Sequence, residues 1–449
     1  MAKGTGWTVG TQLTIQAIAM LSTMVLARLL VPADFGLVAL ATALSGALNA
    51  LTEFSFDLAL IQNQAAARRE YDTAWTLSIC RNAILAAVLA AGAGLIASSF
   101  GDERLEPVVY LLALTTFFNG FQNIAVVDFR KGLAFHRDLV FMVLGKLGPV
   151  VVTIPLAFLW RDYSALVAGI VAGSIFRVAL SFAMHGYRPR IAFDGWRELI
   201  HFSKWLLLSN LSVFIIGRSS TFILGKIVGA HAIGVFSISE DIAGIVMTNL
   251  MMPLRRAILP GYAKLSDNIE RLRDIFVDIV AIVFLVSAPL TLGIGIVADP
   301  LVKLTLGSQW LGAIPLIQVL CVGDFLQLIT AAASPIYIAT GRPQYTMVLH
   351  GGTALATIPL LIFATEWAGV LGAAYATLGV AVISSALDFV LVNRLLNLSI
   401  SRLFAGCWRS IISVIVMVAA VAELQALWPM SQSLGNLASM LAAAVALGG

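Results

Sequence analysis

Long apolar runs follow one another from one end of the chain to the other, separated by short polar turns. Most runs reach about 20 residues, the length an α-helix needs to cross a bilayer. Strict alternation over about 10 residues, typical of a membrane β-barrel, is absent from the sequence. The pattern predicts an all-α polytopic membrane protein with about 14 spans. These lie at 7–30, 35–61, 73–100, 107–129, 139–160, 164–185, 205–225, 232–254, 274–298, 314–339, 344–365, 368–393, 405–427 and 434–449.

The spans fall into a series of six, a longer polar stretch, a second series of six, and two more. We therefore predict an N-terminal six-helix lobe over 1–186, a cytoplasmic linker over 187–204 and a second six-helix lobe over 205–395. Two additional helices occupy 396–449. The last run, 434–449, is short for a helix that crosses a bilayer.

The two six-span series begin alike when the sequence is shifted by 198 residues. A period this long indicates two duplicated halves, because solenoid repeats recur every 20–50 residues. Membrane transporters are often built from such halves, with the substrate site between them. The matched pairs are Trp7 with Trp205, Gln12 with Asn210, Ser22 and Thr23 with Ser220 and Thr221, Arg28 with Lys226, and Gly36 with Gly234.

Composition supports the membrane assignment, because 59% of the residues are hydrophobic and only 12% are charged. Soluble domains carry about 25% charged residues. The net charge of +4 comes from cations at the ends of apolar runs, which excludes a nucleic-acid surface. Cys80, Cys321 and Cys407 lie in or beside apolar runs and are predicted to pack as small core residues, with no metal centre. Since the sequence shows no ATPase motif or other catalytic motif, we predict a transporter without a cofactor.

Lysine and arginine set the predicted orientation. The N-terminus and every second connection after it hold 19 of these residues, whereas the opposite side holds five. The N-terminus is therefore predicted in the cytoplasm, and an even number of spans returns the C-terminus there. The stretch 298–313 is predicted to lie half-buried at the opposite interface, with Trp310 at headgroup level.

Four cations lie well inside predicted spans: Arg81, Lys146, Arg177 and Arg218. Each costs roughly 2.5–3.5 kcal/mol at a helix centre unless it is paired or hydrated. Such residues must face the bundle interior or a water-filled cavity. Together they predict a net basic interior that suits a polar, anionic cargo.

Polar and acidic residues accompany these cations. Ser45, Asn49, Glu53 and Asp57 recur every fourth residue and predict a polar stripe on one helix face. A second stripe holds Thr115, Asn119, Gln122 and Asn123, and the later spans contain Glu240, Asp241 and Asp324. Simpler interpretations stay open. Glu53 and Arg81 can form a plain ion pair, Asp128 and Asp388 can pair near the cytoplasmic ends, and the glycine pairs 169/173 and 225/229 can serve close helix packing.

The segment 26–36 (LARLLVPADFG) resembles the start of bacterial polysaccharide flippases. These form the polysaccharide transport family of the MOP superfamily, which includes O-antigen and exopolysaccharide exporters. Further similar segments are 163–169 (YSALVAG), 229–236 (GAHAIGVF), 300–311 (PLVKLTLGSQWL) and 341–343 (GRP). In order and spacing they extend the resemblance over essentially the whole chain.

The resemblance implies two six-helix lobes around a central cavity, plus two C-terminal helices, in the bacterial inner membrane. It implies that undecaprenyl-pyrophosphate-linked oligosaccharide passes from the cytoplasmic to the periplasmic leaflet by alternating access. The four buried cations fit a cavity that holds the pyrophosphate, and membrane lipids, a polysaccharide polymerase and export machinery are the expected partners. Coupling to H⁺ or Na⁺ would use the acids Glu53, Asp57, Glu240, Asp241 and Asp324.

Two other functions stay open. A drug or metabolite ion antiporter of the same superfamily would favour acids in its cavity, whereas the first half of this chain is basic inside. A membrane-bound polysaccharide polymerase would be expected to display a large periplasmic loop with arginine and histidine. The predicted periplasmic loops are short, and His231 is their only histidine.

Overall fold

The computed structural model describes residues 2–52, 57, 60, 67–132, 134–193, 214–215, 217–251, 254, 258, 261–262, 264–265, 268–342, 344–398, 408, 412 and 416. Within these ranges the regular structure is helical and contains no strand, which confirms the all-α class. The chain forms two compact units, unit 1 from Met1 to Gly234 and unit 2 from Val235 to Gly449.

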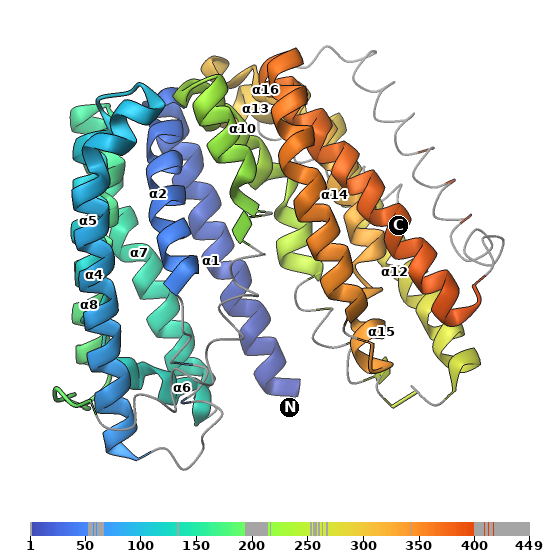
Figure 1. Ribbon diagram of the computed structural model, residues 1–449, viewed down its shortest axis with the longest axis horizontal. Helices are drawn as coiled ribbons and strands as arrows, with labels where there is room; N and C mark the ends of the chain where they lie inside the picture. The colour runs from blue at the N-terminus through green and yellow to red at the C-terminus, as the bar shows by residue number, and fades with distance from the viewer. Residues whose placement is uncertain are drawn as a thin grey trace. The chain divides into compact units, whose positions relative to one another are not determined.

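Unit 1 is a bundle of apolar helices in which consecutive helices pack side by side. α4 lies along α5, α7 lies along α8, and α1 lies along α7 (Figure 1). Short polar turns connect α4 to α5 at 101–104 and α7 to α8 at 161–162, as the sequence pattern predicts. The elements are α1 (Ala2–Leu29), α2 (Pro32–Thr52), α4 (Arg68–Phe100), α5 (Leu105–Asn119), η1 (Ile124–Val127), α6 (Asp128–Lys131), α7 (Phe135–Trp160) and α8 (Tyr163–Met184).

Two glycines of α8 allow a close contact with α7. A Cβ on Gly169 would lie 1.6 Å from Thr153 Oγ1, and one on Gly173 would lie 2.7 Å from Pro149 Cβ. Both positions therefore exclude any larger residue unless α7 moves, as predicted for close helix packing. The glycine pair 225/229 differs, because Gly229 has a φ of 107° and forms a turn before α10. Close packing was the wrong interpretation for that second glycine.

The fourth predicted span is bent and does not continue as one helix. α5 ends at Asn119, and the pair η1 and α6 continues at 72° to it. The turn lies tight against α4, because a Cβ on Gly120 would come within 2.9 Å of Asn82 Cβ. The predicted stripe from Thr115 to Asn123 is therefore not a continuous helix face, and that part of the sequence prediction is wrong.

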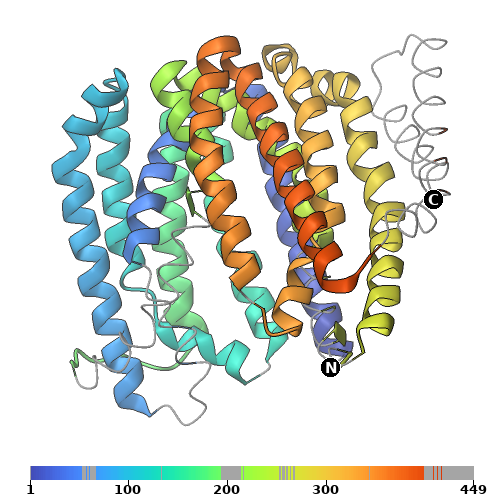
Figure 2. The same cartoon turned by 45° about the vertical axis from the view of Figure 1, so that its right-hand side comes forward.

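Unit 2 is also helical, and α10 (Ala230–Ala243) crosses the boundary into it. α12 packs on α14, and α14 packs on α16. α16 breaks at Ala368 and Gly369 into two arms, seen in orange and red in Figure 2, which agrees with the two predicted spans 344–365 and 368–393. The other elements are η2 (Met247–Met251), α12 (Ile269–Ile296), α13 (Ala298–Thr305), η3 (Ser308–Trp310), α14 (Ala313–Thr330), α15 (Ser334–Ala339) and α16 (Gln344–Leu396).

Trp310 contradicts its predicted place at headgroup level, because its side chain is fully buried. After α13, the chain turns at Gly307 and folds η3 back onto α13. α13 itself buries Ala298, Leu301 and Val302. The stretch 298–313 is thus a packed part of unit 2, and the indole is enclosed there.

Within the described residues, six helices are long and apolar enough to cross a membrane, or seven if the bent fourth pair counts as one span. The protein is therefore a multi-pass membrane protein. The total of about 14 spans stays a prediction, since most of 399–449 lies outside the described residues. The lobe boundaries at 186, 205 and 395 stay predictions too.

Candidate functional site

Lys146 lies in the middle of α7 on a face of its own. Leu144, Val151 and Phe158 recur every seven residues and form an exposed apolar face of α7. Lys146 is also exposed. Because an α-helix turns by about 100° per residue, its side chain points about 160° away from that of Leu144. An exposed cation inside an apolar helix must face water or the bundle interior, because lipid does not solvate it. The lipid-facing side of α7 and its charged side are therefore different.

Arg177 of α8 packs against α7 on the side of Phe141 and Gly145. Its Cγ would be 4.0 Å from a Cβ on Gly145, the residue before Lys146, and its guanidinium lies 5.6 Å from the ring centre of Phe141. Like Lys146, Arg177 is exposed. Two of the four predicted cavity cations thus lie on neighbouring helices, with Arg177 against the turn of α7 that precedes Lys146. We call Lys146 and Arg177 the cation pair.

Arg81 has a different environment, because its guanidinium is hydrogen-bonded to residues of α2. Its Nε donates a hydrogen bond to Thr52 Oγ1 at 3.2 Å, and its Nη2 donates to Asn49 Oδ1 at 2.8 Å. On the same stripe of α2, Ser45 Oγ lies 3.3 Å from Thr116 Oγ1 of α5. The described part of this stripe therefore joins α2 to α4 and α5. Glu53 lies outside the described residues, so its ion pair with Arg81 stays a prediction.

The other predicted residues lie on separate elements. Arg218 is exposed on the helical stretch 217–227, and Asn119 is exposed at the end of α5. Asp57 is half-buried. In unit 2, Glu240 and Asp241 lie near the end of α10, and Asp324 lies in α14.

Asn123 is fully buried, and its side chain is hydrogen-bonded to the backbone at both ends of the amide. Its Oδ1 accepts a hydrogen bond from Ala125 N at 3.1 Å and so caps η1. Its Nδ2 donates to Tyr187 O at 2.9 Å. Both ends of the amide therefore hold the backbone in place where the fourth span bends.

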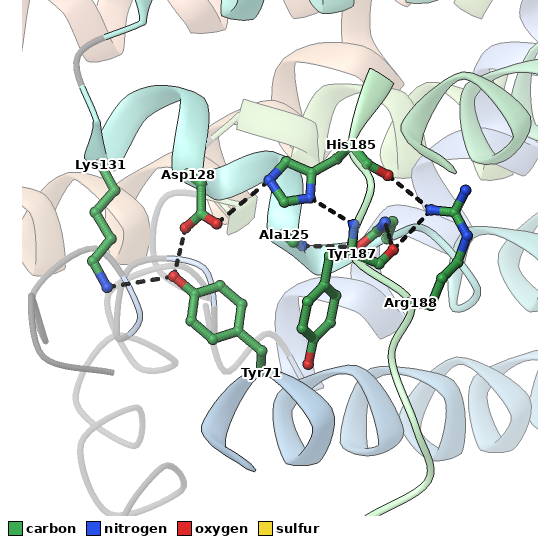
Figure 3. A network of polar contacts seen from close by, with 8 residues as sticks. Tyr71, Ala125, Asp128, Lys131, His185, Tyr187 and Arg188 are labelled. Carbon is green, nitrogen blue, oxygen red and sulfur yellow. Dashed lines mark hydrogen bonds and ion pairs between the residues drawn. The ribbon is translucent and has the colours of Figure 1, made fainter. Parts of the chain in front are cut away.

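A polar network that the sequence did not reveal lies where α4 begins and α8 ends (Figure 3). Tyr71 donates a hydrogen bond to Asp128 Oδ1 at 2.5 Å, and Lys131 Nζ donates to Tyr71 Oη at 3.3 Å. His185 Nε2 lies 3.5 Å from Asp128 Oδ2. His185 Nδ1 accepts from Tyr187 N at 3.2 Å. The network joins α4, α6 and the residues after α8.

The extended segment 185–193 continues from this network and lies along α4. Tyr187 Oη donates to Asp72 Oδ1 at 2.6 Å, and Arg190 N donates to the same oxygen at 2.7 Å. Ala192 N donates to Thr76 Oγ1 at 3.0 Å. Burial and then the hydrogen bond with Asp72 raise the pKa of Tyr187 above its ordinary value, so the phenol stays a donor. The first residues of the predicted linker are thus fixed to unit 1, and we call 185–193 the strap.

Long apolar helices that carry exposed cations, Lys146 and Arg177, define a multi-pass membrane protein. Solved structures support this class. The lipid II flippase MurJ, in an inward closed conformation, superposes with a TM-score of 0.78 at 11% identity, covering 98% of this chain and 96% of that chain. The fold is therefore shared with that protein.

A family model described as "Polysaccharide biosynthesis protein" matches residues 25–315, and the chain belongs to this family. Lipopolysaccharide biosynthesis protein WzxC of Escherichia coli K12 is 23% identical, over 90% of this chain and 84% of its own. Succinoglycan biosynthesis transport protein ExoT of Rhizobium meliloti is 22% identical, over 71% of this chain and 65% of its own. The resemblance seen in the sequence is confirmed.

Proposed function

We propose that the protein is a lipid-linked oligosaccharide flippase. It moves undecaprenyl-pyrophosphate-linked repeat units from the cytoplasmic to the periplasmic leaflet of the bacterial inner membrane, for export of a polysaccharide. Support comes from the family, from relatives named for lipopolysaccharide biosynthesis and succinoglycan transport, and from the fold shared with a lipid II flippase. On this reading the protein transports and does not catalyse.

The cation pair is the observation that carries the proposal. A pyrophosphate diester carries about two negative charges, and the guanidinium of Arg177 presents a planar fork of donors that matches phosphate oxygens. The ammonium of Lys146 adds a compact charge. Both lie on neighbouring apolar helices, α7 and α8. The diphosphate is therefore the part of the substrate that these side chains recognise.

The remaining features of the proposal follow from this assignment. The glycan is solvated by water and polar side chains in a central cavity between two six-helix lobes, while the lipid tail stays in the bilayer. Alternating access exposes the cavity to one leaflet at a time, driven by H⁺ or Na⁺ entry. Both termini lie in the cytoplasm, and a polysaccharide polymerase with its export machinery receives the product.

The test uses proteoliposomes that hold a fluorescent undecaprenyl-pyrophosphate oligosaccharide, with an impermeant quencher that reports the leaflet. Lys146→Gln and Arg177→Gln should each slow transfer by about 10- to 100-fold, because a hydrogen bond to a charged group contributes about 1.5–3 kcal/mol. Arg218→Gln tests the third exposed cation in the same assay. Lys303→Gln is the matched control, since that lysine pairs with Asp299 on the short helix α13.

Wild-type transfer in the Lys146→Gln/Arg177→Gln double variant would refute the role of the cation pair. No transfer by the wild-type protein, with uptake of a small cationic dye against an ion gradient, would instead establish the antiporter function. Membrane insertion of every variant is checked by size-exclusion chromatography before transfer is compared.

A further inference from the structure

α10 is interrupted inside unit 2, beside a carboxylate. The helix ends at Ala243, the chain turns at Gly244, and a π-helical turn, η2, follows. A Cβ on Gly244 would lie 4.0 Å from Asp324 Oδ2 of α14, so the acid lies against the interruption. Single π-helical turns inside α-helices occur frequently at functional sites.

Two contacts fix how α12 and α14 lie along each other. A Cβ on Gly295 would be 3.3 Å from Cys321 Cβ. The rings of Phe284 and Phe325 meet edge to face with centres 5.1 Å apart. The two helices are antiparallel, because Gly295 follows Phe284 in α12 whereas its partner Cys321 precedes Phe325 in α14. The stretch of α12 between the contacts therefore faces the stretch of α14 between them.

These facing stretches hold one acid and two hydroxyls. Asp324 follows Cys321 by three residues, so both lie on the same face of α14. On α12, Thr291 precedes Gly295 by four residues and Ser287 precedes Thr291 by four, so they share the face that meets α14. The carboxyl of Asp324 and the hydroxyls of Ser287 and Thr291 thus occupy the same section of the α12–α14 interface.

Both hydroxyls lack a hydrogen-bond partner among the described residues, although their side chains are fully buried. Among the helical threonines of α16, Thr346 and Thr365 also have no partner in the described residues, whereas others are satisfied within the helix. Thr357 Oγ1 donates to Thr353 O at 2.6 Å, and Thr377 Oγ1 donates to Ala373 O at 3.0 Å. Since a buried hydroxyl without a partner is costly, Ser287 and Thr291 point to a ligand between α12 and α14.

The ligand is not a cationic side chain of the described residues, because none of them lies beside Asp324. In the described ranges, no hydrogen bond or ion pair joins the Asp324 carboxyl to another residue. Cys321 is the nearest ionisable group on α14, and α10 contributes the acids Glu240 and Asp241, which have partners of their own. The parts of α12 and α16 packed against α14 at this level bring no charged residue.

We infer that Asp324, with Ser287 and Thr291, forms a proton-binding site in unit 2. When the carboxyl is ionised, rotation of the two hydroxyl side chains toward Asp324 would let them donate hydrogen bonds to its oxygens. When it takes up a proton, the new O–H donates to a hydroxyl oxygen and the charge disappears. A metal ion would need a larger shell of oxygen ligands. No group of three or more His, Cys, Asp or Glu residues that could hold a metal ion occurs in the described part of the chain.

The role of this site in coupling rests on the proposed function. Proton uptake at Asp324 removes a charge that lies against the interruption of α10, so it changes the cost of moving that helix through the bilayer. A proton that enters from the periplasm and leaves to the cytoplasm would thereby drive the conformational cycle of the flippase. The proton site itself does not depend on what is transported.

The test is pH-dependent modification of the full-length protein in nanodiscs by dicyclohexylcarbodiimide, which reacts with protonated carboxyls in apolar surroundings. Peptide mass spectrometry measures the modified fraction of Asp324 from about pH 5 to about pH 9. The fraction should fall tenfold for each pH unit above the titration midpoint. Asp324→Asn must remove the signal from that peptide.

The hydroxyls are tested with matched substitutions. Thr291→Val and Ser287→Ala each remove a donor to the ionised carboxyl, so modification of Asp324 should persist to higher pH. Thr357→Val is the control, because it makes the same change in a buried threonine whose hydroxyl already has a partner. Equal midpoints in Thr291→Val, Ser287→Ala and the control would overturn the site as drawn.

Two further results would also overturn it. Absence of modification at every pH, in protein that elutes as a single species, would show that Asp324 does not take up a proton. Protection by Na⁺ at constant pH would show a sodium site in its place. These outcomes are separate from the flippase assay. If the wild-type protein fails to flip the lipid, the proposed function fails while the labelling still tests the proton site.

Discussion

Gly36 and Gly234, which the 198-residue shift matches, meet in the structure. A Cβ on Gly36 would lie 1.7 Å from the carbonyl oxygen of Ala230, and one on Gly234 would lie 1.8 Å from the carbonyl oxygen of Pro32. Pro32 and Ala230 are themselves matched by the shift. The start of α2 and the start of α10 therefore make a reciprocal contact, in which each glycine receives the backbone of the other copy.

Alanine at either glycine should destabilise the protein. A carbon and a carbonyl oxygen meet without strain at about 3.3 Å, so a methyl group at either position requires the helices to separate by about 1.5 Å. Overpacking of this kind costs about 1–3 kcal/mol, and backbone atoms have no rotamer that avoids the clash. Because either methyl group separates the same two helices, the double variant should cost less than the two single losses combined.

Thermal unfolding in detergent, followed by tryptophan fluorescence, measures this loss for Gly36→Ala, Gly234→Ala and the double variant. Gly92→Ala is the control, because a Cβ there would meet only Ile96 of its own helix at 3.7 Å. That change should be neutral or stabilising, since alanine is favoured over glycine inside helices by up to about 1 kcal/mol. If Gly36→Ala and Gly234→Ala unfold at the same temperature as Gly92→Ala, the reciprocal contact is not tight in the membrane protein.

Three further predictions concern unit 1. Tyr187→Phe removes the hydrogen bond to Asp72 and should make the strap cleavable by protease at lower enzyme concentration, with Phe182→Leu, which keeps that bond, as the comparison. Because the pKa of Tyr187 is raised, its contribution to stability is present below about pH 10 and is lost as the pH rises further, which alkaline unfolding of the two proteins tests. The hydrogen bonds from Arg104 lower the pKa of Asp102. The Arg104–Asp102 pair therefore stabilises the protein above about pH 4 and loses its effect as the pH falls. Asp102→Asn should flatten this acidic part of the profile of stability against pH.

The sequence predicted those structural features that depend on the residues of a single helix. The bounds of α7 and α8, and the break of α16 near Gly369, follow from apolar periodicity and turn residues. The packing role of Gly169 and Gly173 follows from their spacing. The cations were found because a charge inside an apolar run stands out at any position. None of these features depends on knowing which helices are neighbours.

Where contacts between distant segments decide, the sequence was silent or misleading. The bend after Asn119 depends on α4 passing close to Gly120, and the burial of Trp310 depends on η3 folding against α13. The polar network of Figure 3 joins Tyr71 to Asp128, which lies 57 positions later in the chain. The usable signal was a tyrosine beside an aspartate at one span end and a second tyrosine at another.

The proposed substrate site and the proposed proton site lie in different units of the protein. Within the described helices, Lys146 and Arg177 lie in unit 1, whereas Asp324 lies in unit 2. A substrate bound by one unit and a proton bound by the other are coupled only if both bias the same conformations, and such coupling is reciprocal. Lipid-linked oligosaccharide should therefore shift the pH at which Asp324 is labelled in the wild-type protein. Lys146→Gln/Arg177→Gln should abolish that shift while leaving the midpoint without lipid unchanged, and a midpoint insensitive to lipid in the wild type would show that the two sites act independently.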